Sequence, residues 1–257
     1  MTGKREIIAV ADSDTLARTA AERLLARMPL PLPSPASGGG MGGGRATIAL
    51  TGGSSPEGLY RLLAQEPHRS RIPWERVHWF IGDDRFVPPD DRLSNIGMAR
   101  RLFLDRVNAP AANIHPMATT AASPQTAARL YETELKSFYG ADRLDRARPM
   151  FDLVLMGLGS DGHTASLFPG APALEEKEHW VVGVDKAHLA PFVPRVTLTF
   201  PALASTREML FLVSGEDKRD ILARVLAGED LPAARAASDG ELVWLVDRAA
   251  FAGRNAA

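Results

Sequence analysis

The sequence predicts an α/β fold with a mostly parallel sheet covered by helices on both faces, and three observations carry that prediction. Short, uniformly apolar runs alternate along the chain with segments whose apolar residues recur at helical spacing. Strands that are apolar on both faces are typical of a parallel sheet buried between helices. Glycine-rich turns directly follow several of the runs, and open α/β sheets bind their ligands at such turns after the carboxyl ends of strands.

The strands are expected where four to six mostly apolar residues follow one another. Such runs end in glycine, proline or charged residues, which punctuate secondary structure. The expected strands cover residues 7–10, 46–50, 77–81, 151–156, 180–184, 196–200, 209–213 and 242–246.

The helices are expected between these runs, and local signals mark their ends. Asp12 or Ser13 caps a helix over 12–28, and Pro56 suits the first turn of a helix over 57–65. Ser94 and Ser123 stand before two further helices, and Gly228 closes a last one. These three helices are expected over 94–104, 123–139 and 216–226.

Residues 29–44 form a low-complexity segment of proline, glycine and serine. Such a composition cannot bury enough apolar surface to offset the entropy of ordering, so a flexible loop is expected. The residues before it make only one strand and one helix, too little for a core of their own. We therefore expect one domain over 1–257, with 29–44 as a surface insertion.

Composition excludes several classes of function. Lysine and arginine number 30 against 31 aspartates and glutamates, and no basic run appears, so no nucleic-acid partner is expected. The chain has no cysteine, which excludes disulfides and thiolate chemistry. No apolar run approaches the ~20 residues of a membrane helix, and no secretory h-region is seen. We expect a cytoplasmic protein without a membrane partner.

The segment 156–170, MGLGSDGHTASLFPG, is the most informative motif. It sets Asp161 and His163 in a glycine-rich turn directly after an apolar run. A histidine at the carboxyl end of a strand can move a proton during a reaction. The alternative is a turn in which the histidine merely caps a helix.

A dinucleotide site competes for the same segment. Gly157, Gly159 and Gly162 satisfy G-x-G-x-x-G, and Asp185 stands near the place of a ribose-binding acid. That fingerprint requires a long helix starting at the third glycine. Pro169 interrupts the chain too soon for such a helix, which disfavours this interpretation.

A glycine-serine turn at 50–56, LTGGSSP, predicts an anion site. The backbone N–H groups of Gly52 and Gly53 can turn towards an anion, and Ser54 adds a hydroxyl donor. It is not a Walker loop, because no lysine follows at the required spacing. An ordinary glycine turn remains the alternative.

Charged residues at three other strand ends extend this interpretation. Asp84 and Arg85 follow the run 77–81, Arg195 begins the run at 196, and Lys218 follows the run 209–213. Each alone can be a solvated surface residue. Because strand ends share one edge of a parallel sheet, together they predict one cleft for an anionic small molecule, with His163 at its rim. The remaining histidines show no metal-ligand spacing, so no metal site is expected.

Five ordered motifs give the chain a resemblance to the 6-phosphogluconolactonases. They are LTGGSSP at 50–56, DDRFVPPDDRLSN at 83–95, GLGSDGHTASLFPG at 157–170, PRVTLT at 194–199 and GEDK at 215–218. The resemblance implies a single three-layer α/β/α domain, no cofactor, and hydrolysis of 6-phosphoglucono-δ-lactone in the pentose phosphate pathway. It leaves the oligomeric state open, and we expect a monomer or weak dimer.

Under this resemblance His163 is the general base, held by Asp161 or Asp84. Phosphate is bound by Gly52, Gly53, Ser54, Arg195 and Lys218, with Arg85 on phosphate or lactone. The related glucosamine-6-phosphate deaminases resemble DGHxAFNEP at the histidine, whereas Phe168 stands here in place of their glutamate. This departure favours lactone hydrolysis. A sugar-phosphate sensor that binds without turnover is the remaining alternative.

Overall fold

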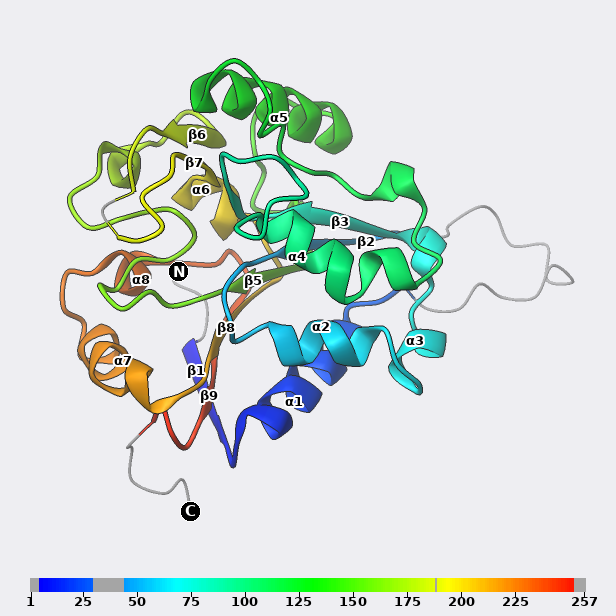
Figure 1. The fold of residues 1–257 in the computed structure, drawn as a ribbon, viewed down its shortest axis with the longest axis vertical. Coiled ribbons are helices and arrows are strands. Elements are labelled where there is room, and N and C mark those ends of the chain that lie inside the picture. The colour runs from blue at the N-terminus through cyan, green and yellow to red at the C-terminus, as the bar shows by residue number, and fades with distance from the viewer. Residues whose placement is uncertain (1–4, 30–43, 188, 252–257) are drawn as a thin grey trace, which may run out of the picture.

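The computed structural model describes residues 5–29, 44–187 and 189–251. Its centre is a six-stranded sheet in the order β1-β9-β8-β5-β2-β3, in which every neighbouring pair is parallel (Figure 1). The strands are β1 (Arg5–Val10), β2 (Ala46–Leu50), β3 (Val77–Ile81), β5 (Leu153–Met156), β8 (Glu208–Val213) and β9 (Glu241–Asp247). The mostly parallel α/β fold is thereby confirmed.

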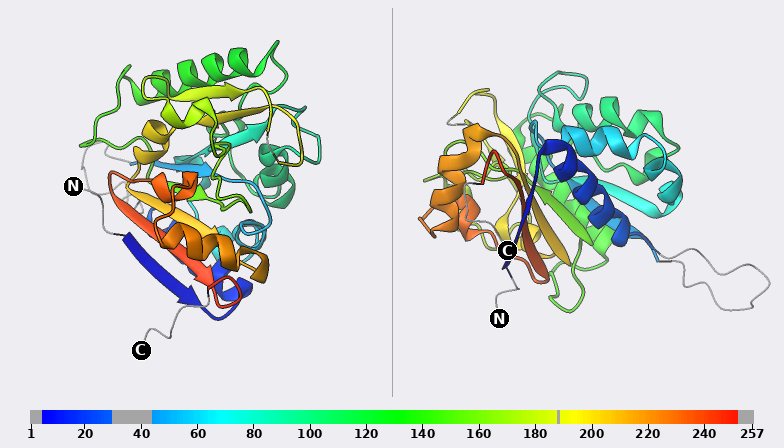
Figure 2. Two further views of the ribbon diagram at one scale, coloured as in Figure 1. Left: turned by 90° about the vertical axis from the view of Figure 1, so that its left-hand side faces the viewer. Right: turned by 90° about the horizontal axis from the view of Figure 1, so that it is seen from below.

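Helices cover both faces of this sheet. Figure 2 shows α1 (Ser13–Ala26), α2 (Glu57–Leu63) and α4 (Asn95–Leu102) on one face, and α7 (Arg219–Leu226) and α8 (Pro232–Arg235) on the other. Helix α5 (Pro124–Tyr139) packs Phe138 on Phe80, whereas the next residue back along β3, Trp79, contacts Phe103 at the end of α4. Adjacent strand residues point to opposite faces, so α5 and α4 lie on opposite sides. Two further short helices are α3 (His68–Arg71) and α6 (Phe200–Ala204).

A second, smaller sheet was not expected, since the sequence predicts one mostly parallel sheet. Strands β6 (Val181–Val184) and β7 (Arg195–Leu198) were expected among the parallel strands, but they pair antiparallel with each other. Strand β4 (Asp83–Arg85), which was not among the expected strands, completes the order β4-β7-β6. Apolar runs do not reveal which partner a strand will choose, because pairing is decided over long sequence separations.

Smaller differences concern the ends of elements. The last helix was expected from residue 216, but Glu216–Lys218 form a 3-10 turn before α7 begins. Most of the expected insertion at 29–44 lies outside the described residues.

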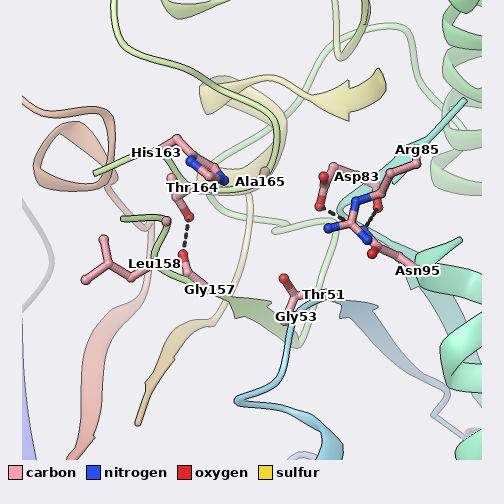
Figure 3. Close-up of a pocket in the computed structure, with 12 residues that line it drawn as sticks. Thr51, Gly53, Asp83, Arg85, Asn95, Gly157, Leu158, His163, Thr164 and Ala165 are labelled. Atoms are coloured by element: carbon pink, nitrogen blue, oxygen red, sulfur yellow. Dashed lines mark hydrogen bonds between the residues drawn. The ribbon is translucent and has the colours of Figure 1, made fainter. Parts of the chain in front are cut away.

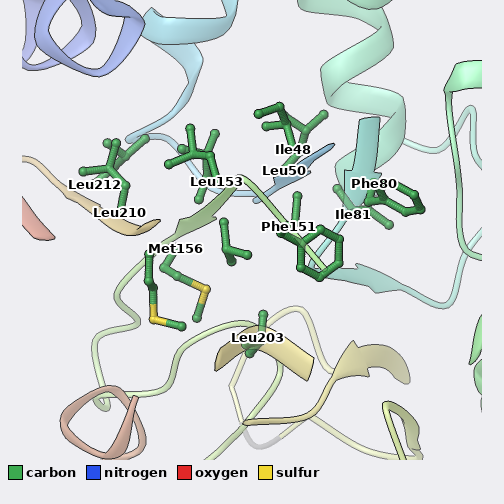
Figure 4. Packing of buried hydrophobic residues seen from close by; sticks show 14 of the residues in the cluster. Ile48, Leu50, Phe80, Ile81, Phe151, Leu153, Met156, Leu203, Leu210 and Leu212 are labelled. Carbon is green, nitrogen blue, oxygen red and sulfur yellow. The ribbon is translucent and has the colours of Figure 1, made fainter. Parts of the chain in front are cut away.

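The core packs on the middle strands of the sheet and holds their carboxyl ends in fixed positions. Every residue of β2 is buried, and Ile48, Leu50, Leu153, Leu210 and Leu212 are fully enclosed (Figure 4). Burying a side chain of this size contributes about 1.5–3 kcal/mol. A strand held this firmly carries the turn at its carboxyl end to a defined position, which is where the candidate site lies.

Candidate active site

One cavity opens where the turns after β2 and β5 meet strand β4 and the start of α4 (Figure 3). The turns come from the two glycine motifs of the sequence, and β4 comes from the small sheet. The residues that line the cavity are Thr51, Gly52, Gly53, Asp83, Arg85, Asn95, Gly157, Leu158, Gly159, His163, Thr164 and Ala165. Four of the predicted site residues are therefore together: Gly52, Gly53, Arg85 and His163.

His163 and Asp161 form a hydrogen-bonded pair at the rim of the cavity. The Asp161 carboxylate accepts a 2.5 Å bond from Nδ1 of His163 and a 3.0 Å bond from the backbone N–H of the same residue. With Nδ1 donating to Asp161, Nε2 is left as the basic nitrogen. Figure 3 shows the imidazole directed into the cavity, towards the side where Asp83 and Arg85 lie.

The environment of Asp161 favours its ionised form. Partial burial opposes ionisation, but the hydrogen bonds and charge of His163 outweigh it and hold the pKa of Asp161 below its usual value. An ionised Asp161 fixes the imidazole tautomer and stabilises the imidazolium that forms when Nε2 takes a proton.

Two neighbours fix the position of the imidazole from its other sides. The ring of Phe168 packs at 4.8 Å between centroids. Gly159 lies directly beneath the imidazole, because a Cβ there would be 2.0 Å from Nδ1 of His163. Position 159, the middle glycine of the G-x-G-x-x-G pattern, therefore requires glycine because the imidazole occupies the place of a side chain. The sequence alone does not show this reason.

Asp84 does not contact His163, and its carboxylate instead accepts hydrogen bonds from nearby backbone N–H groups. It accepts hydrogen bonds from the backbone N–H groups of Arg85 (2.8 Å), Asn95 (2.6 Å) and Ile96 (3.1 Å), and Ser94 donates its hydroxyl at 3.3 Å. It thereby ties β4 to the first turn of α4. Burial raises the pKa of Asp84 to about 6 against these hydrogen bonds, with the nearby Asp83 carboxylate adding to the rise.

Replacing Asp84 by asparagine is expected to lower the free energy of unfolding by about 1–3 kcal/mol, because the new NH₂ group faces backbone donors. The kcat of the folded protein is expected to change by less than about threefold, since Asp161 holds the imidazole. Urea unfolding and steady-state kinetics measure the two quantities. A large loss of kcat with unchanged stability would show that Asp84 acts in catalysis.

The raised pKa of Asp84 also predicts how the difference in stability between wild type and Asp84→Asn changes with pH. The folded state keeps a proton up to about pH 6, which the unfolded carboxyl, with a pKa near 4, has already released. The contribution of Asp84 to stability is therefore full below about pH 4 and falls as the pH rises to about 6. The difference in unfolding free energy between wild type and Asp84→Asn should be larger at pH 4 than at pH 7.

Arg85 and Arg195 lie opposite each other in the β4–β7 ladder, but only Arg85 lines the cavity. Arg85 donates to the carbonyl of Leu93 at 2.7 Å. Arg195 is buried, and its guanidinium donates to the carbonyls of Val193 (3.0 Å) and Pro191 (2.8 Å). Burial, and then the charge of Arg85, lower the pKa of Arg195 to about 10.

Lys218 and Ser54 also lie outside the cavity wall. Lys218 precedes the first residue of α7 and pairs with Asp217 at 3.4 Å. The carbonyl of Ser54 accepts the N–H of Glu57 at the start of α2. Their expected contacts with phosphate stay predictions.

Eight of the twelve cavity residues were not among the predicted site residues, and Asp83 and Asn95 are two of them. Asp83 accepts a 2.6 Å bond from Ser166, and Asn95 donates from Nδ2 to the carbonyl of Asp83 at 2.8 Å. Asn95 follows the helix cap Ser94 in the DDRFVPPDDRLSN motif, which was a usable signal. The bond to Ser166 spans 83 residues, and nothing local in the sequence predicts it.

The dinucleotide interpretation finds no support in the turn after β5. Between β5 and β6 the described residues contain one helical segment, the 3-10 turn Pro172–Glu175, and no helix begins at Gly162. The N-terminal helix that a pyrophosphate needs is therefore missing from this stretch.

Within residues 5–29, 44–187 and 189–251, no helix is both long and apolar enough to cross a membrane. Within the same residues, no three histidine or acidic side chains gather as metal ligands would.

Fold and site together define a class of protein: a mostly parallel α/β scaffold that sets a histidine–aspartate pair beside a glycine-rich loop at the carboxyl end of the sheet. The particular family follows from comparison. Residues 11–244 match the model of the glucosamine-6-phosphate isomerase/6-phosphogluconolactonase family, and the chain belongs to that family.

Relatives in sequence and structure agree with this assignment. The chain is 44% identical to a 6-phosphogluconolactonase of Synechocystis over 80% of this chain and 84% of that protein. It is 39% identical to one of Mycobacterium bovis over 94% and 95%. A solved 6-phosphogluconolactonase of Thermotoga maritima superposes with a TM-score of 0.77 at 29% identity, covering 95% of this chain and 100% of that one.

Proposed function

We propose that this protein hydrolyses 6-phosphoglucono-δ-lactone to 6-phosphogluconate in the pentose phosphate pathway. The observation that carries the proposal is the His163–Asp161 pair facing a cavity that Gly52, Gly53 and Arg85 also line. The 6-phosphogluconolactonase names of the relatives from Synechocystis and Mycobacterium bovis support the same reaction. No resident cofactor is needed for it, because water is the only co-reactant.

The phosphate of the substrate binds the backbone N–H groups of Gly52, Gly53 and Ser54. Arg85 supplies positive charge from the cavity wall, Arg195 adds charge from the position opposite Arg85 in the β4–β7 ladder, and Lys218 adds a third cation. Bidentate contact between a guanidinium and phosphate is strong and directional. Anchoring the phosphate in this way brings C1 of the lactone to His163.

Hydrolysis then needs one proton carrier. Nε2 of His163 takes a proton from water as the water oxygen attacks C1, and the carbonyl oxygen becomes an oxyanion. Backbone amides of the turn after β5, or Arg85, donate to that oxyanion. The carbonyl re-forms as the bond from C1 to the ring oxygen breaks, and His163 returns its proton to the ring oxygen. Asp161 stabilises the imidazolium between the two steps.

The packing around His163 favours the lactonase over a deaminase. The ring of Phe168 lies against the imidazole, where the related deaminases have a glutamate to partner the histidine. Sugar ring opening and proton shuttling need that acid, whereas lactone hydrolysis does not. A sensor that binds sugar phosphate without turnover would not need the hydrogen-bonded His163–Asp161 pair, so the pair favours an enzyme.

The test is lactone hydrolysis by the purified protein. 6-Phosphoglucono-δ-lactone is generated in situ, and the spontaneous rate is subtracted. Acceleration over that rate is the expected result. No acceleration, together with ammonia release from glucosamine 6-phosphate, would identify the deaminase activity. Binding of 6-phosphogluconate without any turnover would identify a sensor.

Arg85→Gln is expected to lower kcat/KM by roughly tenfold or more, because it removes a charge-assisted contact. A rise in KM would assign Arg85 to the phosphate, and a fall in kcat would assign it to the oxyanion. Arg92→Gln is the matched control, since Arg92 is an exposed arginine outside the cavity lining. Equal kcat/KM values for the two variants would remove Arg85 from the site.

We further infer a cytoplasmic monomer or weak dimer. Among the described residues, the exposed large apolar side chains are Ile7, Leu130 and Phe192, on β1, α5 and the β6–β7 loop. Scattered single residues of this kind do not form the apolar patch of a stable interface. Sedimentation at several concentrations tests the assembly state.

A further inference from the structure

Tyr60 connects helix α2 back to the start of the glycine loop. Its side chain is fully buried, and its hydroxyl lies against the backbone of Thr51. The hydroxyl accepts a 3.0 Å hydrogen bond from the Thr51 N–H and donates a 2.8 Å bond to the Thr51 carbonyl. One side-chain oxygen therefore satisfies both backbone groups of a residue that lines the cavity.

Thr51 needs this partner because the sheet ends one residue before it. On one side β2 pairs with β3 as far as Leu50, and on the other side it pairs with β5 only as far as Ala49. The carbonyl of Leu50 accepts the N–H of Gly82, and the ladder stops there. Thr51 is 6% exposed, so its N–H and C=O are largely shielded from water and unpaired without Tyr60.

We propose that Tyr60 is a positioning residue for phosphate: by fixing Thr51, its hydroxyl aims the Gly52 and Gly53 amides at the anion. The inference rests on the proposed function, in which these amides bind the phosphate of the lactone. Tyr60 itself touches no substrate, and it acts through the backbone of the loop.

The next residue of the loop is already fixed from another side. A Cβ on Gly52 would lie 2.0 Å from Oδ1 of Asn95, so the Asn95 amide packs directly against the Gly52 backbone. Asn95 is itself held by its bond to the carbonyl of Asp83. Contacts at Thr51 and Gly52 together set the loop, and the Thr51 contact is the one that a single oxygen atom supplies.

Tyr60→Phe removes that oxygen and leaves the packing of the ring in place. The ring lies 5.1 Å from that of Phe103 in the apolar core, which accepts phenylalanine equally well. Tyr139→Phe is the matched control. The Tyr139 hydroxyl also accepts a backbone N–H, from Asp145 at 2.9 Å, and donates to a carbonyl, of Arg148 at 2.7 Å, but unlike Thr51 neither of these partners lines the cavity.

The experiment compares wild type, Tyr60→Phe and Tyr139→Phe in lactone hydrolysis and in calorimetric titration with inorganic phosphate. Tyr60→Phe should raise both KM and the Kd for phosphate by about threefold to tenfold, in keeping with the loss of a buried hydrogen-bonding partner. Its kcat should stay within about twofold, because His163 lies on a different loop. Tyr139→Phe should leave KM, kcat and the Kd at wild-type values.

Two results would overturn the inference. One is a Tyr60→Phe variant with wild-type KM and wild-type Kd for phosphate. The other is an equal change in both tyrosine variants, which would reflect a general loss of stability. Should the wild type hydrolyse no lactone, the proposed function fails, and the phosphate titration still decides whether Tyr60 positions the loop.

Discussion

His163→Ala is expected to lower kcat for 6-phosphoglucono-δ-lactone by about 10²–10⁴, the range for loss of a general base. Nε2 of His163 is the basic nitrogen that faces the cavity, because Nδ1 is committed to Asp161 at 2.5 Å. The KM should change much less, since the proposed phosphate contacts lie on the glycine loop and not on His163. Initial rates after subtraction of spontaneous hydrolysis measure both quantities.

His179→Ala provides the control for this result. His179 is an exposed histidine, with 63% of its side chain accessible, and it lies outside the cavity lining. The same substitution there should leave kcat unchanged. A loss below tenfold in His163→Ala would show that the imidazole is not the base, whatever the control gives.

The strands of the central sheet could be predicted from the sequence because each is a local apolar run. The expected ranges for β2 and β3 coincide with those observed, and helix α5 ends at Tyr139 as its spacing predicts. Buried parallel strands are apolar on both faces, so their signal survives without knowledge of their neighbours. The glycine motifs directly after these strands line the cavity, and they could be recognised because the strands before them could be predicted.

The second sheet could not be predicted in this way. Strand β4 consists of Asp83, Asp84 and Arg85, whose charged side chains do not indicate a strand, and it forms only by pairing with β7. The tasks of the two aspartates are also set by distant partners, Ser166 for Asp83 and the start of α4 for Asp84. Charge and spacing identify such residues as candidates, but only the tertiary contacts separate helix caps from cavity walls.

Gly159→Ala is expected to lower kcat by roughly 10²-fold without unfolding the protein. A Cβ at this position would lie 2.0 Å from Nδ1, 2.1 Å from Cε1 and 2.7 Å from Cγ of His163. Real side chains do not approach so closely, so the imidazole must move and its bond to Asp161 is lost. Displacing a catalytic group by about 1 Å can cost that factor in rate. Steady-state kinetics and the ring NMR signals of His163 follow the two effects.

Gly157→Ala separates this clash from the mere presence of a methyl group in the turn. A Cβ on Gly157 meets nothing closer than 3.8 Å, at the carbonyl of Gly52 and the hydroxyl of Thr51. Neither glycine has a positive φ, so alanine strains neither backbone. The His163–Asp161 pair should therefore survive in Gly157→Ala and be lost in Gly159→Ala. An intact pair and wild-type kcat in Gly159→Ala would show that the turn yields instead of the imidazole, and that the position of His163 does not depend on this glycine.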